Sequence, residues 1–514
     1  MDDPGVPRPP GPGSIHLRSP SLTSREWVLV AGAGIASVAL GWWVTANPGL
    51  LRLGIPLTPP TMAGGLGVAA VVVAVLLGPG FALGLLVALV YLNFSDVLVR
   101  SFGFPSILQL MALPILISAW THHGPGLSRR IVGEPLTWLL AAYTLVLLLS
   151  TTWALEPGLA ERRFADIVKA LVLYVLLVAL VTSPRRARIA VWTMVGVGGF
   201  LGAVGILRLT MGVWPALAGL ARVKRAHLYG DVFGDRLAGP LGDPNYFAQI
   251  LLILVPLALF LTWEEKALRN RLTAVLSLGL IVSAAVLTYS RGGALALALV
   301  VGASFLAQGV QWRRIVLGGL AVAMGASLLV PSGFRERLTT MGQFLPDEAV
   351  LTETDSSFEE RMVLMGAAWE MLADNSMLGV GAGNYTARFG EYAERFGSVA
   401  LDYRDPDDVR YPHSLYLEVG AETGALGLLV FLAALLTAFV GLHRARDSFV
   451  RTGYRATGAL ARALQISLAG YLVSSFFLHG DFERYLWLLL GMAGALHAMS
   501  RMEAEAALGV RHGR

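Results

Sequence analysis

The sequence contains no cysteine, and only 15% of its 514 residues are charged. The absence of cysteine excludes disulfides, thiolate metal sites and cysteine nucleophiles. A soluble protein of this length would carry roughly 25% charged residues. The chain is instead 55% hydrophobic, and long apolar runs occur along most of its length. Most of the chain is therefore expected to be solvated by lipid.

The first 25 residues lack an apolar core, because they are rich in proline, glycine and serine. This composition predicts a disordered tail, and it is too polar for a secretory signal peptide. The first apolar segment begins at Trp27 and is therefore expected to be a retained membrane anchor.

The apolar runs predict an all-α, polytopic membrane protein, since only a helix satisfies its own backbone groups in lipid. A span needs about 20 apolar residues, and on this criterion the chain has about 12–14 spans. The candidate runs are residues 27–45, 61–77, 79–93, 105–120, 135–153, 167–183, 188–210, 245–262, 272–289, 292–310, 315–332, 413–442, 459–478 and 484–500.

Basic residues predict the orientation of these spans. With the N-terminus in the cytoplasm, alternation places every clearly basic short loop there, together with the tail 501–514. Membrane helices then occupy residues 26–332 and 412–500. The segment 333–411 becomes one large extracytoplasmic loop, in which apolar periodicity predicts amphipathic helices. A glycine-rich turn at 378–383 favours a folded lid over a disordered loop.

Arg291 lies in a short break between two apolar runs, in the order Tyr-Ser-Arg-Gly-Gly. Arginine is disfavoured on the outer side of the membrane, where the alternation places it. The two glycines would let a ligand approach the backbone closely. A guanidinium bonds two phosphate oxygens at once, so Arg291 is a candidate catalytic residue. The alternative is an arginine that reaches lipid headgroups.

Arg236 belongs to an outer loop, residues 211–243, that is unusually basic for its side of the membrane. An anionic substrate explains this placement better than a solvated loop does. Arg236 is therefore a candidate substrate-binding residue.

His413 opens a long apolar run, directly after Pro412. Proline fits the first turn of a helix, which would place His413 at a helix N-terminus at the outer membrane edge. The positive end of the helix dipole disfavours imidazolium and keeps the ring able to accept a proton. A purely structural histidine is the alternative.

Arg361 is expected to begin an amphipathic helix in the large outer loop. A contact with substrate and a salt bridge to a neighbouring glutamate are equally good explanations. Glu418 and Glu422 share one helix face, where they could orient an arginine, accept a proton or simply be solvated. The last outer loop, which contains His479, is expected to close the same cavity.

No motif for a metal or cofactor is present. The first outer loop, residues 46–61, contains no acidic residue that could bind a metal. The candidate groups also face away from the cytoplasm, where nucleotide sugars are found. A lipid-borne donor with a pyrophosphate leaving group remains, with no metal, cofactor or nucleic acid as partner.

These motifs resemble those of the O-antigen ligase and polymerase superfamily of bacterial envelope glycosyltransferases. His413-Ser414 is followed after nine residues by Gly424 and then by Gly427, which fits the pattern H-[NSQ]-x9-G-x-x-[GTY] of the ligases. The resemblance covers about residues 135–500, and the N-terminal part departs from the roughly twelve spans of these ligases. Three further motifs fall in the order that the family shows: Asp-Pro-Asn at 243–245, Ser-Arg-Gly-Gly at 290–293 and Leu-Gly-Val-Gly-Ala-Gly-Asn-Tyr at 378–385.

The resemblance implies metal-independent, inverting transfer of a glycan from undecaprenyl pyrophosphate to an acceptor hydroxyl, on the outer face of the bacterial inner membrane. Arg291 and Arg236 would hold the pyrophosphate. His413 would activate or position the acceptor hydroxyl. Ser414 and Asn245, which lie within the motifs, join Arg236 and Arg361 as candidate substrate-binding residues. The acceptor would be a glycolipid or a glycan covered by the large outer loop.

Three alternatives to a ligase remain open. A polymerase would join two lipid-linked repeat units, and a related branch would glycosylate protein hydroxyls. A transporter or flippase of lipid-linked oligosaccharides would carry charged residues near the bilayer midplane. The predicted spans are nearly free of such charges, which favours a transferase.

Overall fold

The computed structural model describes residues 78–93, 115, 126–212, 219–229, 232–314, 356–396, 410–480 and 483–512. Several predicted features lie outside these residues: the N-terminal tail, the spans at 27–45, 61–77, 105–120 (apart from Ile115) and 315–332, and parts of the loop 333–411.

Helices make up most of the described residues and confirm the predicted all-α class. Every predicted span that lies within the described residues contains helix. The helices are α3 (Pro79–Tyr91), α6 (Gly126–Val132), α7 (Pro135–Ser150), α8 (Pro157–Leu180), α9 (Pro184–Met211), α10 (Pro244–Leu252), α11 (Val255–Glu264), α12 (Leu268–Val286), α13 (Arg291–Ala307), α16 (Ser356–Asp374), α17 (Tyr385–Ala393), the 3-10 helix η5 (Glu394–Phe396), α18 (Leu415–Arg451), α19 (Arg455–Ser474) and α20 (Arg484–His512).

Four helical segments among the described residues are long and apolar enough to cross a membrane. The bent pair α6 and α7, whose axes differ by 65°, would make a fifth if it forms one span. These segments establish a polytopic membrane protein. The four are Pro184–Met211, Pro244–Glu264, Leu268–Val286 and Leu415–Arg451.

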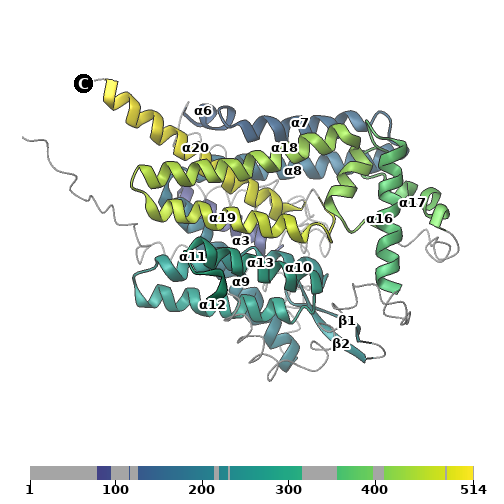
Figure 1. Cartoon of the computed structure of the whole chain (residues 1–514), viewed down its shortest axis with the longest axis horizontal. Helices are drawn as coiled ribbons and strands as arrows, with labels where there is room; N and C mark the ends of the chain where they lie inside the picture. The colour runs from purple at the N-terminus through teal and green to yellow at the C-terminus, as the bar shows by residue number, and fades with distance from the viewer. Residues whose placement is uncertain are drawn as a thin grey trace, which may run out of the picture.

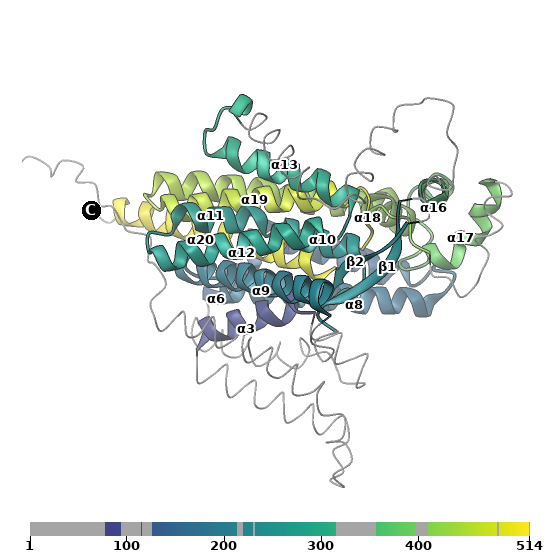
Figure 2. The ribbon, with the colours of Figure 1, turned by 90° about the horizontal axis from the view of Figure 1, so that it is seen from below.

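The long helices lie side by side, and further elements cover one end of the bundle (Figures 1 and 2). Helix α16 runs across the direction of the bundle at that end, with α17 beside it and a β-hairpin below (Figure 1). We call this the α16 end. The turns between α8 and α9, α11 and α12, and α18 and α19 lie together at the opposite end (Figure 1).

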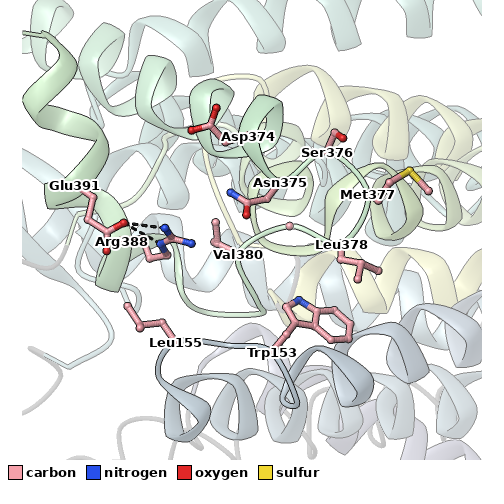
Figure 3. Close-up of a pocket in the computed structure, with 11 residues that line it drawn as sticks. Trp153, Leu155, Asp374, Asn375, Ser376, Met377, Leu378, Val380, Arg388 and Glu391 are labelled. Atoms are coloured by element: carbon pink, nitrogen blue, oxygen red, sulfur yellow. Dashed lines mark hydrogen bonds and ion pairs between the residues drawn. The ribbon is translucent and has the colours of Figure 1, made fainter.

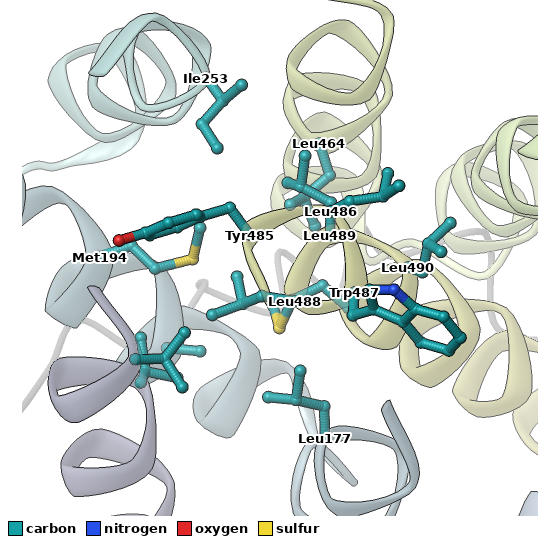
Figure 4. Packing of buried hydrophobic residues seen from close by; sticks show 14 of the residues in the cluster. Leu177, Met194, Ile253, Leu464, Tyr485, Leu486, Trp487, Leu488, Leu489 and Leu490 are labelled. Carbon is teal, nitrogen blue, oxygen red and sulfur yellow. The ribbon is translucent and has the colours of Figure 1, made fainter. Parts of the chain in front are cut away.

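Helix α20 is central to the packing because its first turns are apolar on every side. Its consecutive residues 485–490 are each at most 1% exposed. Figure 4 shows them surrounded by Leu177 of α8, Met194 of α9 and Leu464 of α19. A helix that is hydrophobic all round belongs either in a protein core or in lipid, and here neighbouring helices surround it. The helices that carry the candidate site residues are therefore fixed against one common core.

Small residues allow α9 and α12 to approach each other closely. A Cβ atom on Gly202 would lie 2.7 Å from the carbonyl oxygen of Leu280, and one on Gly199 would lie 3.0 Å from Oγ of Ser277. Close backbone approach at small residues is a main source of helix association in lipid, where no hydrophobic difference separates helix from solvent.

The sequence did not predict the hairpin of strands β1 (Arg222–Tyr229) and β2 (Val232–Gly239). The strands pair antiparallel, with Lys224 opposite Arg236, inside the segment that was expected to be a loop. The hairpin is the one sheet among the described residues. It gives the basic residues of this segment fixed positions at the α16 end.

Candidate active site

The hairpin brings Arg236 to the break between α12 and α13. The Nε of Arg236 donates to the carbonyl oxygen of Thr288 at 2.8 Å, and an Nη of Arg236 donates to Oδ1 of Asn245 at 3.2 Å. Asn245 in turn lies in the first turn of α10, where Asp243 caps the helix by accepting from the Asn245 and Tyr246 backbone N–H groups. Two predicted substrate-binding residues, Arg236 and Asn245, are thus in direct contact.

Arg291 is the first residue of α13 and is partly buried. The Ser290 side chain caps this helix by accepting from the backbone N–H of Gly293 at 3.2 Å. A Cβ atom on Gly293 would lie 2.8 Å from Cβ of Ala248, so the close approach of α10 accounts for this glycine. Packing against α10 therefore explains Gly293 without a ligand near the backbone. No other described residue forms a hydrogen bond or ion pair with the Arg291 side chain.

His413 lies just before α18, which begins at Leu415 with Ser414 as its N-cap. The expectation that Pro412 occupies the first helical turn is wrong, because the chain turns first at His413. The backbone φ of His413 is 47°, in the left-handed region that residues other than glycine adopt only uncommonly. Ser414 is buried and makes no side-chain capping bond. Such backbone strain persists only where the surroundings impose it.

The environment of His413 keeps its imidazole neutral. The pKa of His413 is lowered to about 4, chiefly by burial and also by the positive charges of Arg361 and Arg410, while Asp243 opposes the shift. The Nδ1 atom of His413 is buried and has no hydrogen-bond partner among the described residues. The neutral ring was predicted from a helix dipole, whereas burial and neighbouring arginines are the larger causes here. The structure thus brings Arg361 close to His413.

A second histidine, His479, contacts His413 edge to face, with ring centroids 5.8 Å apart. The His479 ring stacks on Tyr411 at 4.1 Å. The hydroxyl of Tyr246 lies 2.8 Å from Nδ1 of His479 and 3.0 Å from its carbonyl oxygen. Because the single hydroxyl proton can go to the carbonyl, Nδ1 is then the donor to Tyr246 and Nε2 remains an acceptor. Burial lowers the pKa of His479 well below its usual value, so this ring is also neutral.

A buried ion-pair cluster fixes the start of α18. Arg163 of α8 forms a salt bridge with Glu418 and lies 3.6 Å from Glu422. The second oxygen of Glu418 accepts from the backbone N–H of Gly480 at 2.5 Å, directly beside His479. Glu422 accepts from the backbone N–H of Gly383 at 2.7 Å. The cluster therefore joins α8, α18, the His479 loop and the glycine-rich segment.

Comparison with protein families identifies the segment that holds much of this site. Residues 272–432 match the family model described as O-antigen ligase. This segment is therefore similar to the O-antigen ligase family, and we call residues 272–432 the O-antigen ligase domain. The match confirms the resemblance predicted from the sequence, and it contains Arg291, Arg361, His413 and Ser414. Arg236 and Asn245 precede it. No curated protein matches the chain.

The two motif glycines of the O-antigen ligase domain have a structural explanation. Helix α18 is broken at Gly424, where φ is 64° and ψ is −167°. The segment after α16 packs against this break, and Ala425 donates its N–H to the Ser376 carbonyl at 2.7 Å. A Cβ atom on Gly424 would lie 2.4 Å from the Met377 carbonyl carbon, and one on Gly427 would lie 2.0 Å from Oγ1 of Thr423. Gly424 therefore does not accept a side chain, and a side chain at Gly427 would require Thr423 to move.

Replacement of Gly424 by alanine is expected to destabilise the O-antigen ligase domain by about 1–3 kcal/mol through backbone strain alone. The clash with Met377 adds to this loss. The thermal midpoint of the purified protein in detergent measures the effect. Gly279→Ala on α12 is the matched control, because a Cβ atom there meets nothing within 4 Å. Equal midpoints for the two variants would contradict the assigned role of the break.

Some residues of the site were missed or only weakly indicated by the sequence. Arg163 was not singled out, although it follows Arg162 in a predicted outer loop, where basic residues are disfavoured. Tyr246 and Tyr411 carry no signal besides their places next to the motifs. His479 was predicted only as part of a loop that closes the cavity. Its contact with His413 depends on the packing of α19 beside α18.

Proposed function

We propose that this protein is a glycosyltransferase that moves a glycan from undecaprenyl pyrophosphate to an acceptor hydroxyl, at the outer face of the bacterial inner membrane. The observation that carries the proposal is a neutral histidine, His413, among arginines at one end of a membrane bundle. The O-antigen ligase match supports the reaction class. The basic turns gathered at the opposite end support an extracytoplasmic site under the positive-inside rule (Figure 1).

The proposed step is a direct displacement at the anomeric carbon. The acceptor oxygen forms a bond to that carbon, and His413 accepts the hydroxyl proton. The bond from the anomeric carbon to the phosphate oxygen breaks, and its electron pair leaves with the pyrophosphate. Attack opposite the leaving group inverts the anomeric configuration. Arg291 and Arg236 stabilise the charge that the pyrophosphate gains, while Arg361 and Asn245 orient the substrates. Metal ions have no role in this proposal.

The described spans support a transferase over a transporter. Their buried charged groups lie near helix ends, where they pair: Arg163 with Glu418 at the α16 end and Arg188 with Glu265, 2.5 Å apart, at the opposite end. A transport path would instead require charged groups near the middle of the spans. A polymerase would use the same chemistry with a second lipid-linked unit as acceptor.

Arg291→Ala is expected to lower the rate of transfer about 10- to 150-fold, which corresponds to the 1.5–3 kcal/mol of a hydrogen bond to a charged group. Arg291→Lys should restore only part of the rate, because an ammonium does not form the two-pronged bond of guanidinium. The assay uses purified protein, lipid-linked donor and either a lipid A–core acceptor or a second donor molecule. The preferred acceptor distinguishes ligase from polymerase.

Arg208→Ala is the matched control, since Arg208 ends α9 at the same end and donates to the Gly212 carbonyl at 3.3 Å. Full transfer by both Arg291→Ala and His413→Ala would disprove the assigned site. Movement of lipid-linked glycan between leaflets without formation of a glycosidic bond would disprove the transferase and establish the transporter.

A further inference from the structure

A groove of about 650 Å³ lies at the α16 end, beside the last turn of α16 and the segment that follows it (Figure 3). One wall is the segment after α7, with Trp153 and Leu155, and the other is the turn after α16 with the facing side of α17. Arg361 and Asp374 lie about 20 Å apart along α16, at 1.5 Å per residue. The groove is therefore separate from the site around His413.

One side of the groove is apolar and accessible. Leu155 is 56% exposed, Met377 67% and Leu378 45%. The indole of Trp153 faces the same space (Figure 3), and its Nε1 atom is buried without a hydrogen-bond partner among the described residues. The groove thus offers an aromatic surface next to exposed apolar side chains.

The other side presents oxygen acceptors that neighbours hold in place. Arg388 donates twice to Oε2 of Glu391, at 3.1 and 2.8 Å, which leaves Oε1 of Glu391 open. Arg395 donates to Oδ2 of Asp374 at 2.7 Å and leaves Oδ1 open. The amide nitrogen of Asn375 donates to the Tyr392 hydroxyl at 3.1 Å, so the amide oxygen remains. Groups that are already oriented in this way bind a ligand with little further ordering.

The charge of the lining selects among ligands. Two carboxylates and one guanidinium line the groove, so a phosphate or another anion is disfavoured there. An acyl chain would leave the carboxylate and amide oxygens without partners. A sugar ring fits both sides, because its C–H face stacks on an indole and its hydroxyls donate to oxygen acceptors.

We propose that this groove binds uncharged sugar residues of a glycan chain, remote from the bond that reacts. The inference rests on the proposed transferase function and extends it to the recognition of chain length. Glycans of one or two sugars held at His413 would not reach the groove, whereas longer chains would fill it. The bound chain belongs either to the donor or to the acceptor.

Trp153→Ala in the full-length protein is expected to raise KM about three- to tenfold for long glycans, the amount expected for a lost aromatic contact. The kcat values and the KM for single-sugar substrates should not change. Varying the length of the donor glycan and of the acceptor glycan separately shows which of them occupies the groove. Trp138→Ala is the matched control. Trp138 lies on α7, the helix that precedes Trp153, is 60% exposed and donates to the Val132 carbonyl.

Binding is also measured without transfer, by saturation-transfer NMR on the His413→Ala protein. The probe is the water-soluble glycan released by mild acid from the polyprenyl-linked pool of the native cells. Glu391→Gln is a second variant that keeps the shape of the groove. Binding that is weakened by Trp153→Ala and by Glu391→Gln supports the groove. Binding and KM that do not change in either variant, for any chain length, overturn it. Wild-type protein that binds the glycan but transfers nothing would refute the proposed function and leave the groove established.

Discussion

Replacing His413 with alanine is expected to lower the rate of glycan transfer about 100- to 10,000-fold, the contribution of a positioned general base. The backbone of His413 is held at φ 47° and its ring is neutral, so the side chain has a fixed position and an available lone pair. The positive charges of the neighbouring arginines disfavour protonation of the ring and favour the binding of an anionic substrate. The measurement is single-turnover formation of the glycosidic bond by purified protein.

His443→Ala is the matched control for this experiment. His443 lies toward the other end of the same helix, α18, with its side chain 57% exposed. Both variants should elute from gel filtration as the wild type does, since neither histidine supports the core. A His413→Ala protein that transfers glycan at more than a tenth of the wild-type rate would remove His413 from the mechanism.

The same histidine predicts the response of the enzyme to acid. The base must be unprotonated, so kcat/KM should hold constant as pH falls from neutral and drop only near the His413 pKa of about 4. Arg361→Met removes a positive charge that lowers this pKa, so the acid limb of the profile should move to higher pH. An acid limb that stays in place would show that another group controls it. Loss of a substrate contact alone would lower the rate without moving the limb.

Most of the membrane fold could be predicted because an apolar run of span length has few other solutions in lipid. The runs that became α9, α12 and α18 needed no tertiary information. The hairpin did not follow from the same reasoning, because β1 and β2 are short and charged residues interrupt their apolar ones. The hairpin is stabilised by the pairing of β1 with β2 and by the hydrogen bond from Arg236 to the Thr288 carbonyl.

The candidate site divides in the same way. Arg291, His413 and Ser414 were found from local motifs. Arg236 was found because its loop is basic although it is predicted to lie on the outer side of the membrane. Their mutual arrangement depends on contacts that no local pattern contains. Arg163 meets Glu418 across 255 positions of sequence, and Tyr246 meets His479 across 233. An amphipathic helix was predicted in this part of the outer loop, but the sequence did not show which face of α16 packs on α17 and α18. Val363, Ala367 and Met371 are buried there, whereas Met362 and Trp369 are 52% and 61% exposed.

Arg163→Met is expected to destabilise the protein by about 3–5 kcal/mol, because it removes the positive charge that pairs with the buried carboxylate of Glu418 and lies 3.6 Å from that of Glu422. Glu418 is 1% exposed and Glu422 5%. Neither can turn toward water, since Oε2 of Glu418 accepts from the Gly480 N–H and Oε2 of Glu422 accepts from the Gly383 N–H. The loss should lower the thermal midpoint in detergent, and it should also lower transfer, because the Gly480 bond places the His479 loop.

The neighbouring residue separates this effect from a general loss of positive charge. Arg162 is exposed and donates to the Gly158 carbonyl of its own helix, so Arg162→Met should leave the midpoint within about 0.5 kcal/mol of the wild type. Adding Glu418→Gln and Glu422→Gln to Arg163→Met should recover part of the stability, since an amide oxygen still accepts from Gly480 and Gly383 and no unpaired charge remains. A triple variant as unstable as Arg163→Met would show that the arginine acts through its packing and that the carboxylates carry no electrostatic penalty. Recovery of the midpoint without recovery of transfer would instead show that the charged cluster sets the position of the His479 loop beside His413.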